Sequence, residues 1–139
     1  MNINENQDQL IAAFAPYEDW FEKYEHLVRL GEELPSMGKD LKNDENAVSG
    51  CQSMLWIAAK NENGHLLYHA DSDAKITRGI IAAVLKVVNR QTPEDILKAD
   101  FYFLEDIGFT YNLSPSRSNG LSAIMRKVKA LAEKALASR

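Results

Sequence analysis

The only cysteine of this 139-residue chain, Cys51, lies in the stretch V-S-G-C-Q-S-M-L-W. A lone cysteine is often a small buried hydrophobic residue. Here, however, the thiol follows Gly50 and a long polar segment, and Gln52 and Ser53 separate it from the apolar run that comes next. This position predicts a thiol on a loop, where it is available for chemistry, rather than a cysteine inside the core.

Counting residues excludes several chemistries of cysteine. Iron–sulfur clusters are usually held by three or four cysteines, so one thiol cannot hold a cluster alone. A structural zinc site needs four ligands, and Cys51 with His26, His65 and His69 shows no ligand spacing. A cysteine-dependent acyl transferase would need a histidine base in contact with the thiol. His65 and His69 are candidates for that base, although the strand face that they share could equally be solvated.

The chemistry that remains is thiol exchange with another protein. A thiolate attacks a sulfur atom on the partner, the leaving thiol departs, and the sulfur stays on the attacking residue. An unperturbed cysteine is only slightly ionised at neutral pH. If the fold brings Arg117 near Cys51, its positive charge would raise the thiolate fraction. Alternatively, Arg117 forms a salt bridge at the start of a helix. Because a second cysteine could resolve the product into a disulfide, a single thiol suits a sulfur carrier.

Composition indicates one soluble globular domain over residues 1–139, with 45% hydrophobic and 26% charged residues. No apolar run is long enough to cross a membrane. The polar, acidic N-terminus lacks the features of a signal peptide. We therefore expect a cytoplasmic protein without membrane contact, and the single cysteine fits that reducing compartment.

The net charge of −4 is unevenly distributed along the chain. Residues 1–46 contain 11 acidic and 4 basic residues, whereas residues 117–139 contain 6 basic residues and 1 acidic residue. The basic segment has no interleaved aromatic residues, which argues against a nucleic-acid partner. Such a distribution is typical of solvated surface, or of a polarised surface that orients a protein partner.

Apolar spacing predicts helices before the cysteine and a loop that leads to it. A short apolar patch is interrupted by Pro16, and from residue 17 onward apolar residues recur every three or four positions. Gly31 and Pro35 mark the end of that helix. Residues 36–50 are polar without periodicity, which predicts a loop.

The clearest hairpin of the sequence follows the cysteine. Residues 54–60 and 65–70 read as strands, and Asn63-Gly64 between them is a strong signal for a tight turn. Ser72 is predicted to cap the next helix, whose first turn begins with Asp73. That helix is apolar on most sides, so we place it at the centre of the domain.

The rest of the chain reads as helix. Thr92-Pro93 begins a brief helix, residues 100–107 form another before Gly108, and Ser114-Pro115 opens the last one. The order of elements predicts an α+β domain, in which a small antiparallel β-sheet is covered by helices.

The segment around Cys51 resembles the V-x-G-C-Q-S-x-V-W signature of the SufE family, whose members accept persulfide sulfur during iron–sulfur cluster assembly. Further blocks match the family in order over about residues 17–132, namely L-G-E-E-L-P, A-D-S-D-A-K-I-T-R-G, T-P-E-D-I-L and L-S-P-S-R-S-N-G-L. Departures are small: Phe109 stands where leucine is common, and residues 89–91 lack a glycine often found there. Gln52-Ser53 favours SufE proper over the related CsdE branch.

The resemblance implies a fold shared with the IscU-type scaffold, with the cysteine on a loop at one end of the sheet. It implies that Cys51 takes sulfur from a SufS-like cysteine desulfurase, raises the turnover of that enzyme and passes sulfur to a cluster scaffold. Pyridoxal phosphate belongs to the desulfurase, so we expect this chain to need neither cofactor nor metal and not to be an enzyme on its own. A non-covalent adaptor of the desulfurase is the alternative, and the sequence leaves open whether the chain forms a homodimer.

Further residues are expected to support Cys51. Gly50 would allow the backbone geometry of the loop, and Gln52 and Ser53 would form hydrogen bonds around the thiol. Asp71 and Asp73, with the serine between them, have two interpretations: part of a helix cap, or contact with the loop that carries the cysteine.

Overall fold

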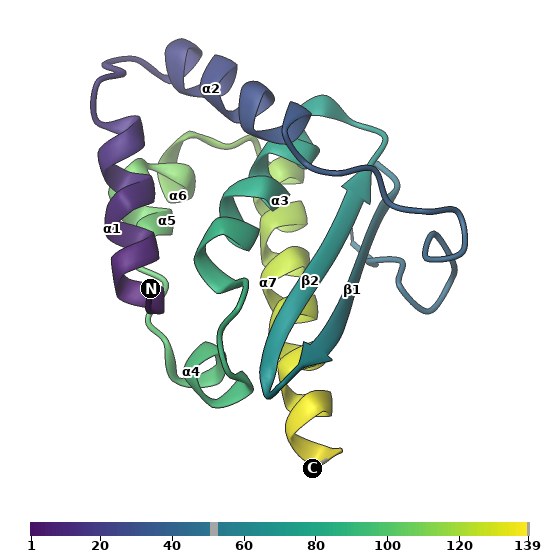
Figure 1. Ribbon diagram of the computed structural model, residues 1–139. Coiled ribbons are helices and arrows are strands. Elements are labelled where there is room, and N and C mark those ends of the chain that lie inside the picture. Colours follow the sequence, from purple (N-terminus) through teal and green to yellow (C-terminus); the bar gives the residue numbers. More distant parts are fainter. Residues whose placement is uncertain (51–52, 139) are drawn as a thin grey trace.

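The computed structural model describes residues 1–50 and 53–138. These residues form seven helices and one two-stranded antiparallel sheet, so the predicted α+β fold with a small sheet is confirmed. Figure 1 shows the sheet on one side of α3 and α7 and α1 on the other, with α2 crossing the end of this arrangement.

Two helices precede the sheet, α1 (Ile3–Phe14) and α2 (Trp20–Glu32). The side chain of Asn2 accepts a hydrogen bond from the backbone N–H of Glu5 and caps α1. Asp19 caps α2 in the same way, by accepting from the N–H of Glu22. Because Asp19 is the cap, α2 begins later than the predicted residue 17.

Glycines allow α2 to pack closely against α3 (Lys75–Val88). A Cβ atom at Gly31 would lie 2.8 Å from the backbone nitrogen of Gly79, and one at Gly79 would overlap the carbonyl oxygen of Leu27. Gly31 therefore does not end α2, which continues to Glu32. Its role is to let two backbones approach each other, and it places α2 across the first turns of α3.

The predicted hairpin is confirmed as β1 (Leu55–Glu62) and β2 (His65–Ser72). Asn63 and Gly64 have positive φ angles of 55° and 88°, as a tight turn between twisted strands requires. Alternating side chains turn one face of the hairpin toward the core, and the buried ones are Leu55, Ile57, Leu66, Tyr68 and Ala70.

The prediction that Ser72 caps α3 is wrong. β2 extends to Ser72, and the residue at the N-cap position of α3 is Ala74, which provides no side-chain cap. The Ser72 hydroxyl accepts from the N–H of Ala74 at 3.2 Å and donates to the carbonyl oxygen of Met54 at 2.7 Å, so it joins the end of β2 to the residue before β1. The central position of α3 is confirmed, because most of its apolar side chains are fully buried.

Four helices complete the chain: α4 (Pro93–Lys98), α5 (Phe103–Ile107), α6 (Phe109–Asn112) and α7 (Pro115–Ala137). α5 is shorter than predicted because the buried side chain of Gln7 bonds to the carbonyl of Asp100 and to the N–H of Phe103. Gly108, at φ 102°, separates α5 from α6, which was not predicted. Within the described residues, no helix combines the length and apolarity that a bilayer span requires.

Candidate functional site

Backbone hydrogen bonds at the free edge of β1 close the base of the loop that contains Cys51. The N–H of Val48 donates to the carbonyl of Leu55, and the N–H of Ile57 donates to the carbonyl of Asn46, both at 2.9 Å. The end of the long predicted loop is thus paired with β1. The chain enters and leaves the cysteine loop through two segments that lie side by side.

Cys51 and Gln52 lie outside the described residues, and their neighbours Gly50 and Ser53 define the site. Gly50 has φ 94°, in the left-handed region that favours glycine. An added Cβ atom would lie 3.6 Å from the Cβ of Ala123 and 3.8 Å from a guanidinium nitrogen of Arg126, which are ordinary contacts. The backbone angle, rather than lack of space, therefore requires glycine here.

Hydrogen bonds from α3 and from Asp73, between β2 and α3, hold the segment that follows the cysteine. The Ser53 hydroxyl lies 3.2 Å from the hydroxyl of Thr77. The N–H of Met54 donates to the Asp73 carboxylate at 3.1 Å, and the N–H of Asp73 donates back to the Met54 carbonyl at 3.3 Å. Asp73 therefore contacts Met54, in the segment that follows the cysteine, and its side chain does not cap α3.

Asp71 is a buried carboxylate that holds residues 37–42, in the segment that leads to the cysteine loop. It accepts hydrogen bonds from the N–H groups of Met37 and Ser72, at 3.3 and 2.8 Å. It also forms ion pairs with Lys42 at 3.3 Å and Arg78 at 3.4 Å. Burial by itself would raise the pKa of Asp71, but the two backbone hydrogen bonds and the two cations outweigh burial and hold that pKa below its ordinary value.

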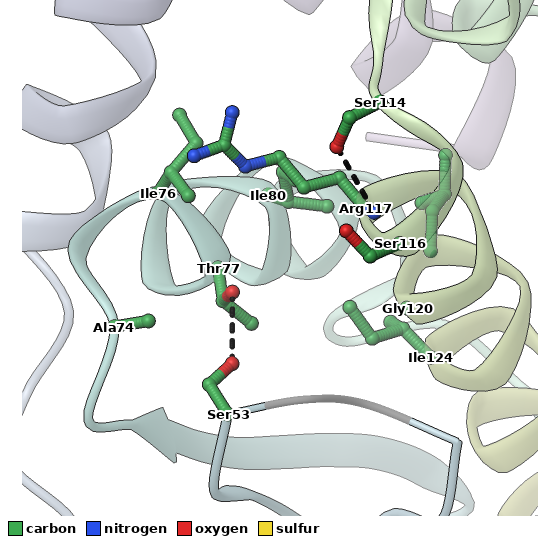
Figure 2. Close-up of a pocket in the computed structure, with 11 residues that line it drawn as sticks. Ser53, Ala74, Ile76, Thr77, Ile80, Ser114, Ser116, Arg117, Gly120 and Ile124 are labelled. Carbon is green, nitrogen blue, oxygen red and sulfur yellow. Dashed lines mark hydrogen bonds between the residues drawn. The ribbon is translucent and has the colours of Figure 1, made fainter.

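A cavity of about 380 Å³ opens beside Ser53, between the first turns of α3 and α7 (Figure 2). Its lining combines hydroxyl groups, one guanidinium and branched apolar side chains, namely those of Ser53, Thr77, Ser114, Ser116, Arg117, Ile76, Ile80, Leu121 and Ile124. Hydroxyl donors and a cation favour a negatively charged group, while the apolar side chains suit a large polarisable atom such as sulfur.

Arg117 lies at the edge of this cavity, and it is the only charged residue among those that line it within the described part of the chain. Its backbone N–H is capped by the Ser114 hydroxyl at 3.4 Å. Its Nη1 donates to the hydroxyl of Tyr24 at 2.6 Å, and its guanidinium stands over the Tyr24 ring. Among the described residues Arg117 forms no ion pair, so it is held as a cation rather than neutralised at the helix start.

The two histidines that were candidate bases lie outside this cavity. Both are exposed on the outer face of β2. His65 pairs with Glu62 next to the hairpin turn, and His69 pairs with Ala58. Neither residue lines the cavity beside Ser53. The arrangement thus gives no support to a histidine-assisted acyl transfer.

Sequence reasoning missed Tyr24, Thr77 and Lys42 as parts of the site. Tyr24 fits the apolar period of its helix, and no spacing signal indicates that its hydroxyl reaches a residue 93 positions away. Lys42 lies in a polar segment without periodicity. Its distance to Asp71 could be found only from the fold.

Comparisons with known proteins support the fold and identify the family. The solution structure of a hypothetical protein from Thermus thermophilus has the same fold, with a TM-score of 0.74 at 18% sequence identity, over 95% of this chain and 96% of that one. The family model for SufE, described as an Fe-S metabolism associated domain, matches residues 8–132. This match begins nine residues before the resemblance noted in the sequence and includes every residue of the site. The chain therefore belongs to the SufE family and is associated with Fe–S metabolism.

Proposed function

We propose that this chain is a sulfur carrier in iron–sulfur cluster assembly. Cys51 accepts persulfide sulfur from a partner cysteine desulfurase, holds it as a cysteine persulfide and passes it to a cluster scaffold. The observation that carries the proposal is the family match over residues 8–132, which includes the single cysteine of the chain. This role agrees with an Fe–S metabolism associated domain that has one thiol and no second thiol to trap it.

The proposed step is a thiol exchange at sulfur. The Cys51 thiolate attacks the terminal sulfur of the partner's cysteine persulfide, a new S–S bond forms, and the partner's S–S bond breaks. The partner's cysteine leaves as a thiolate, and the transferred sulfur keeps its proton. The numbers of electrons and protons are unchanged, so the step needs neither an oxidant nor a metal.

The surroundings of Gly50 and Ser53 support this chemistry. A persulfide is readily ionised, and the cavity beside Ser53 offers hydroxyl groups and the Arg117 cation to a negatively charged sulfur. The positive φ angle of Gly50 sets the direction of the backbone before Cys51, and the hydrogen bond from the Met54 N–H to the Asp73 carboxylate holds the backbone after Ser53.

The desulfurase carries out the carbon–sulfur chemistry with its own pyridoxal phosphate, and this chain contributes only the acceptor thiol. By removing the sulfur, the chain regenerates the free cysteine of the desulfurase and raises its turnover. We accordingly propose an accessory protein of the cytoplasm without a cofactor of its own, rather than an enzyme.

The test is substitution of Cys51 by serine. Cys51→Ser should fold as the wild type does, because an O–H replaces an S–H of nearly the same shape, and it should still bind the desulfurase. It should lose the stimulation of sulfide release from cysteine. Sulfide release is measured with a SufS-type desulfurase, with and without each form of the chain. Full stimulation by the serine variant would exclude a covalent carrier and favour a non-covalent adaptor.

Intact-mass spectrometry gives a second, independent readout. After incubation with desulfurase and cysteine, the wild-type chain should gain the mass of one sulfur atom, and the gain should disappear on treatment with a thiol reductant. The Cys51→Ser chain should gain nothing. An acyl mass on the wild type, or no adduct at all, would contradict the proposal.

A further inference from the structure

Phe21 is unusually exposed for its size. Its side chain is 72% exposed on α2, although the rest of the apolar residues of that helix are half-buried or buried. On a helix, residues spaced by three and seven positions share one face, so Phe21 lies on the same face as Tyr24 and Val28. We call these three residues the α2 face.

The α2 face is continuous with the cavity beside the cysteine loop. The ring and the hydroxyl of Tyr24 both contact Arg117, and Arg117 lines the cavity together with Ser53. Met54, which follows Ser53 in the chain, has a side chain that is 52% exposed. Exposed apolar side chains are thus present on α2 and next to Ser53, the first described residue after Cys51.

Carboxylates surround the α2 face. Glu18, Glu22 and Glu25 lie near Phe21 in the sequence, and each is exposed. None of the three forms an ion pair with another residue in the described part of the chain. An exposed phenylalanine bordered by unpaired acidic residues is complementary to an apolar pocket bordered by lysine or arginine.

We propose that the α2 face and Met54 form the surface on which the cysteine desulfurase docks, and that the Phe21 ring enters an apolar pocket of the desulfurase bordered by basic residues. The inference rests on the proposed function, because it takes the desulfurase as the protein that must reach Cys51. Aromatic side chains, methionine and arginine are enriched at protein interfaces, and a few of them usually provide most of the affinity. Phe21 combines that residue type with high exposure and a position next to the site.

The first test compares two equally exposed aromatic residues. Phe21→Gln removes the proposed anchor, whereas Tyr111→Gln removes the ring of a side chain that is 73% exposed on α6, where its hydroxyl bonds to Glu105. Glutamine is a good helix former, so both variants should fold normally, and circular dichroism checks this. The dissociation constant for a SufS-type desulfurase, measured by calorimetry without cysteine, should rise at least tenfold for Phe21→Gln. It should stay within twofold of the wild type for Tyr111→Gln.

The second test concerns the exposed glutamates near Phe21, which we call the acidic border. The single variant Glu25→Lys should weaken binding at low salt and reduce the salt dependence of the dissociation constant. Glu62→Lys is the matched control, because Glu62 is an exposed acid at the hairpin turn, at the opposite end of the sheet from α2 (Figure 1). Equal effects of the two charge reversals would show a general response to net charge and would overturn the proposed border.

The outcomes separate this surface from the proposed function. Phe21→Gln should still gain one sulfur atom on Cys51 when the desulfurase is present above its raised dissociation constant. If the wild type accepts sulfur and Phe21→Gln binds as tightly as the wild type, the docking surface is wrong and the carrier function stands. If the wild type binds the desulfurase but never gains sulfur, the carrier function is wrong, whatever the variants of the α2 face do.

Discussion

The guanidinium of Arg117 and the phenol of Tyr24 form a single unit at the edge of the cavity. Nη1 of Arg117 lies 2.6 Å from the Tyr24 hydroxyl, and the centre of the guanidinium lies 5.2 Å from the centre of the ring. A charged donor forms a stronger hydrogen bond than a neutral one. The pair therefore joins α2 to the start of α7 and holds a positive charge at the edge of the cavity without neutralising it.

Removal of this charge should slow sulfur acceptance and leave the fold intact. We expect Arg117→Ala to reduce the rate at which the chain gains sulfur from a limiting amount of desulfurase by about tenfold, the effect of losing roughly 1.4 kcal/mol of charge stabilisation. Arg117→Lys should recover part of the rate, because it restores the charge. The rate is measured by quenched mass spectrometry. The free energy of unfolding should fall by only about 1 kcal/mol for Arg117→Ala, because the exposed hydrogen bond to Tyr24 is lost, and the chain stays folded.

Lys98→Ala provides the control for Arg117→Ala. Lys98 is a well-exposed cation on α4 that pairs with Asp95, and it does not line the cavity. Its removal should leave sulfur acceptance unchanged. Comparable rates for Arg117→Ala and the wild type would show that this cation takes no part in the transfer.

Much of the fold could be predicted because its local signals are strong. Asn63-Gly64 predicts the hairpin turn since both residues tolerate positive φ, and the structure has that turn. Thr92 with Pro93 predicts the start of α4, where the Thr92 hydroxyl caps the N–H of Asp95. Such signals act within a few residues, so one sequence contains all the information that they need.

The errors occurred where distant parts of the chain compete for the same backbone groups. Ser72 has the residue type of a helix cap, but its hydroxyl accepts from the N–H of Ala74, before the first residue of α3, and donates to the distant Met54 carbonyl. Residues 100–102 would extend α5 at its start, but Gln7, about a hundred residues earlier, binds the Asp100 carbonyl and the Phe103 N–H. The same limit applies to the site, where the contacts of Asp71 with Met37 and Lys42 join segments that no local pattern relates.

Asp71 should be important for stability at neutral pH. Asp71→Ala leaves two buried N–H groups and two cations without their acceptor. We expect a loss of about 3 kcal/mol in the free energy of unfolding, the lower end for buried pairs, because Lys42 and Arg78 remain 33% and 25% exposed. Asp71→Asn keeps an acceptor oxygen and should lose less. Urea unfolding of both variants and the wild type gives the comparison.

The contribution of Asp71 should also depend on pH in a defined direction. Its pKa is lower in the folded protein than in the unfolded chain, so the unfolded chain binds more protons as the solution is acidified. The stabilisation is therefore fully present above the unfolded pKa of about 3.9 and is lost as pH falls through the lower folded pKa. The stability difference between wild type and Asp71→Asn should stay constant from neutral pH to about pH 5 and shrink below about pH 4. A difference that grows on acidification would contradict this role.

Gly50 and Gly64 allow the backbone effect of a glycine to be separated from an effect on the site. Both have positive φ angles, 94° and 88°, and a methyl group at either position would meet no close contact. Gly50→Ala and Gly64→Ala should therefore each lower the free energy of unfolding by about 1 kcal/mol through backbone strain alone. Gly64 is in the hairpin turn, whereas Gly50 is the residue before Cys51, so only Gly50→Ala should slow sulfur gain in the mass assay. If both variants transfer sulfur equally fast at temperatures where both are folded, the left-handed conformation of Gly50 serves the fold and has no part in presenting the thiol.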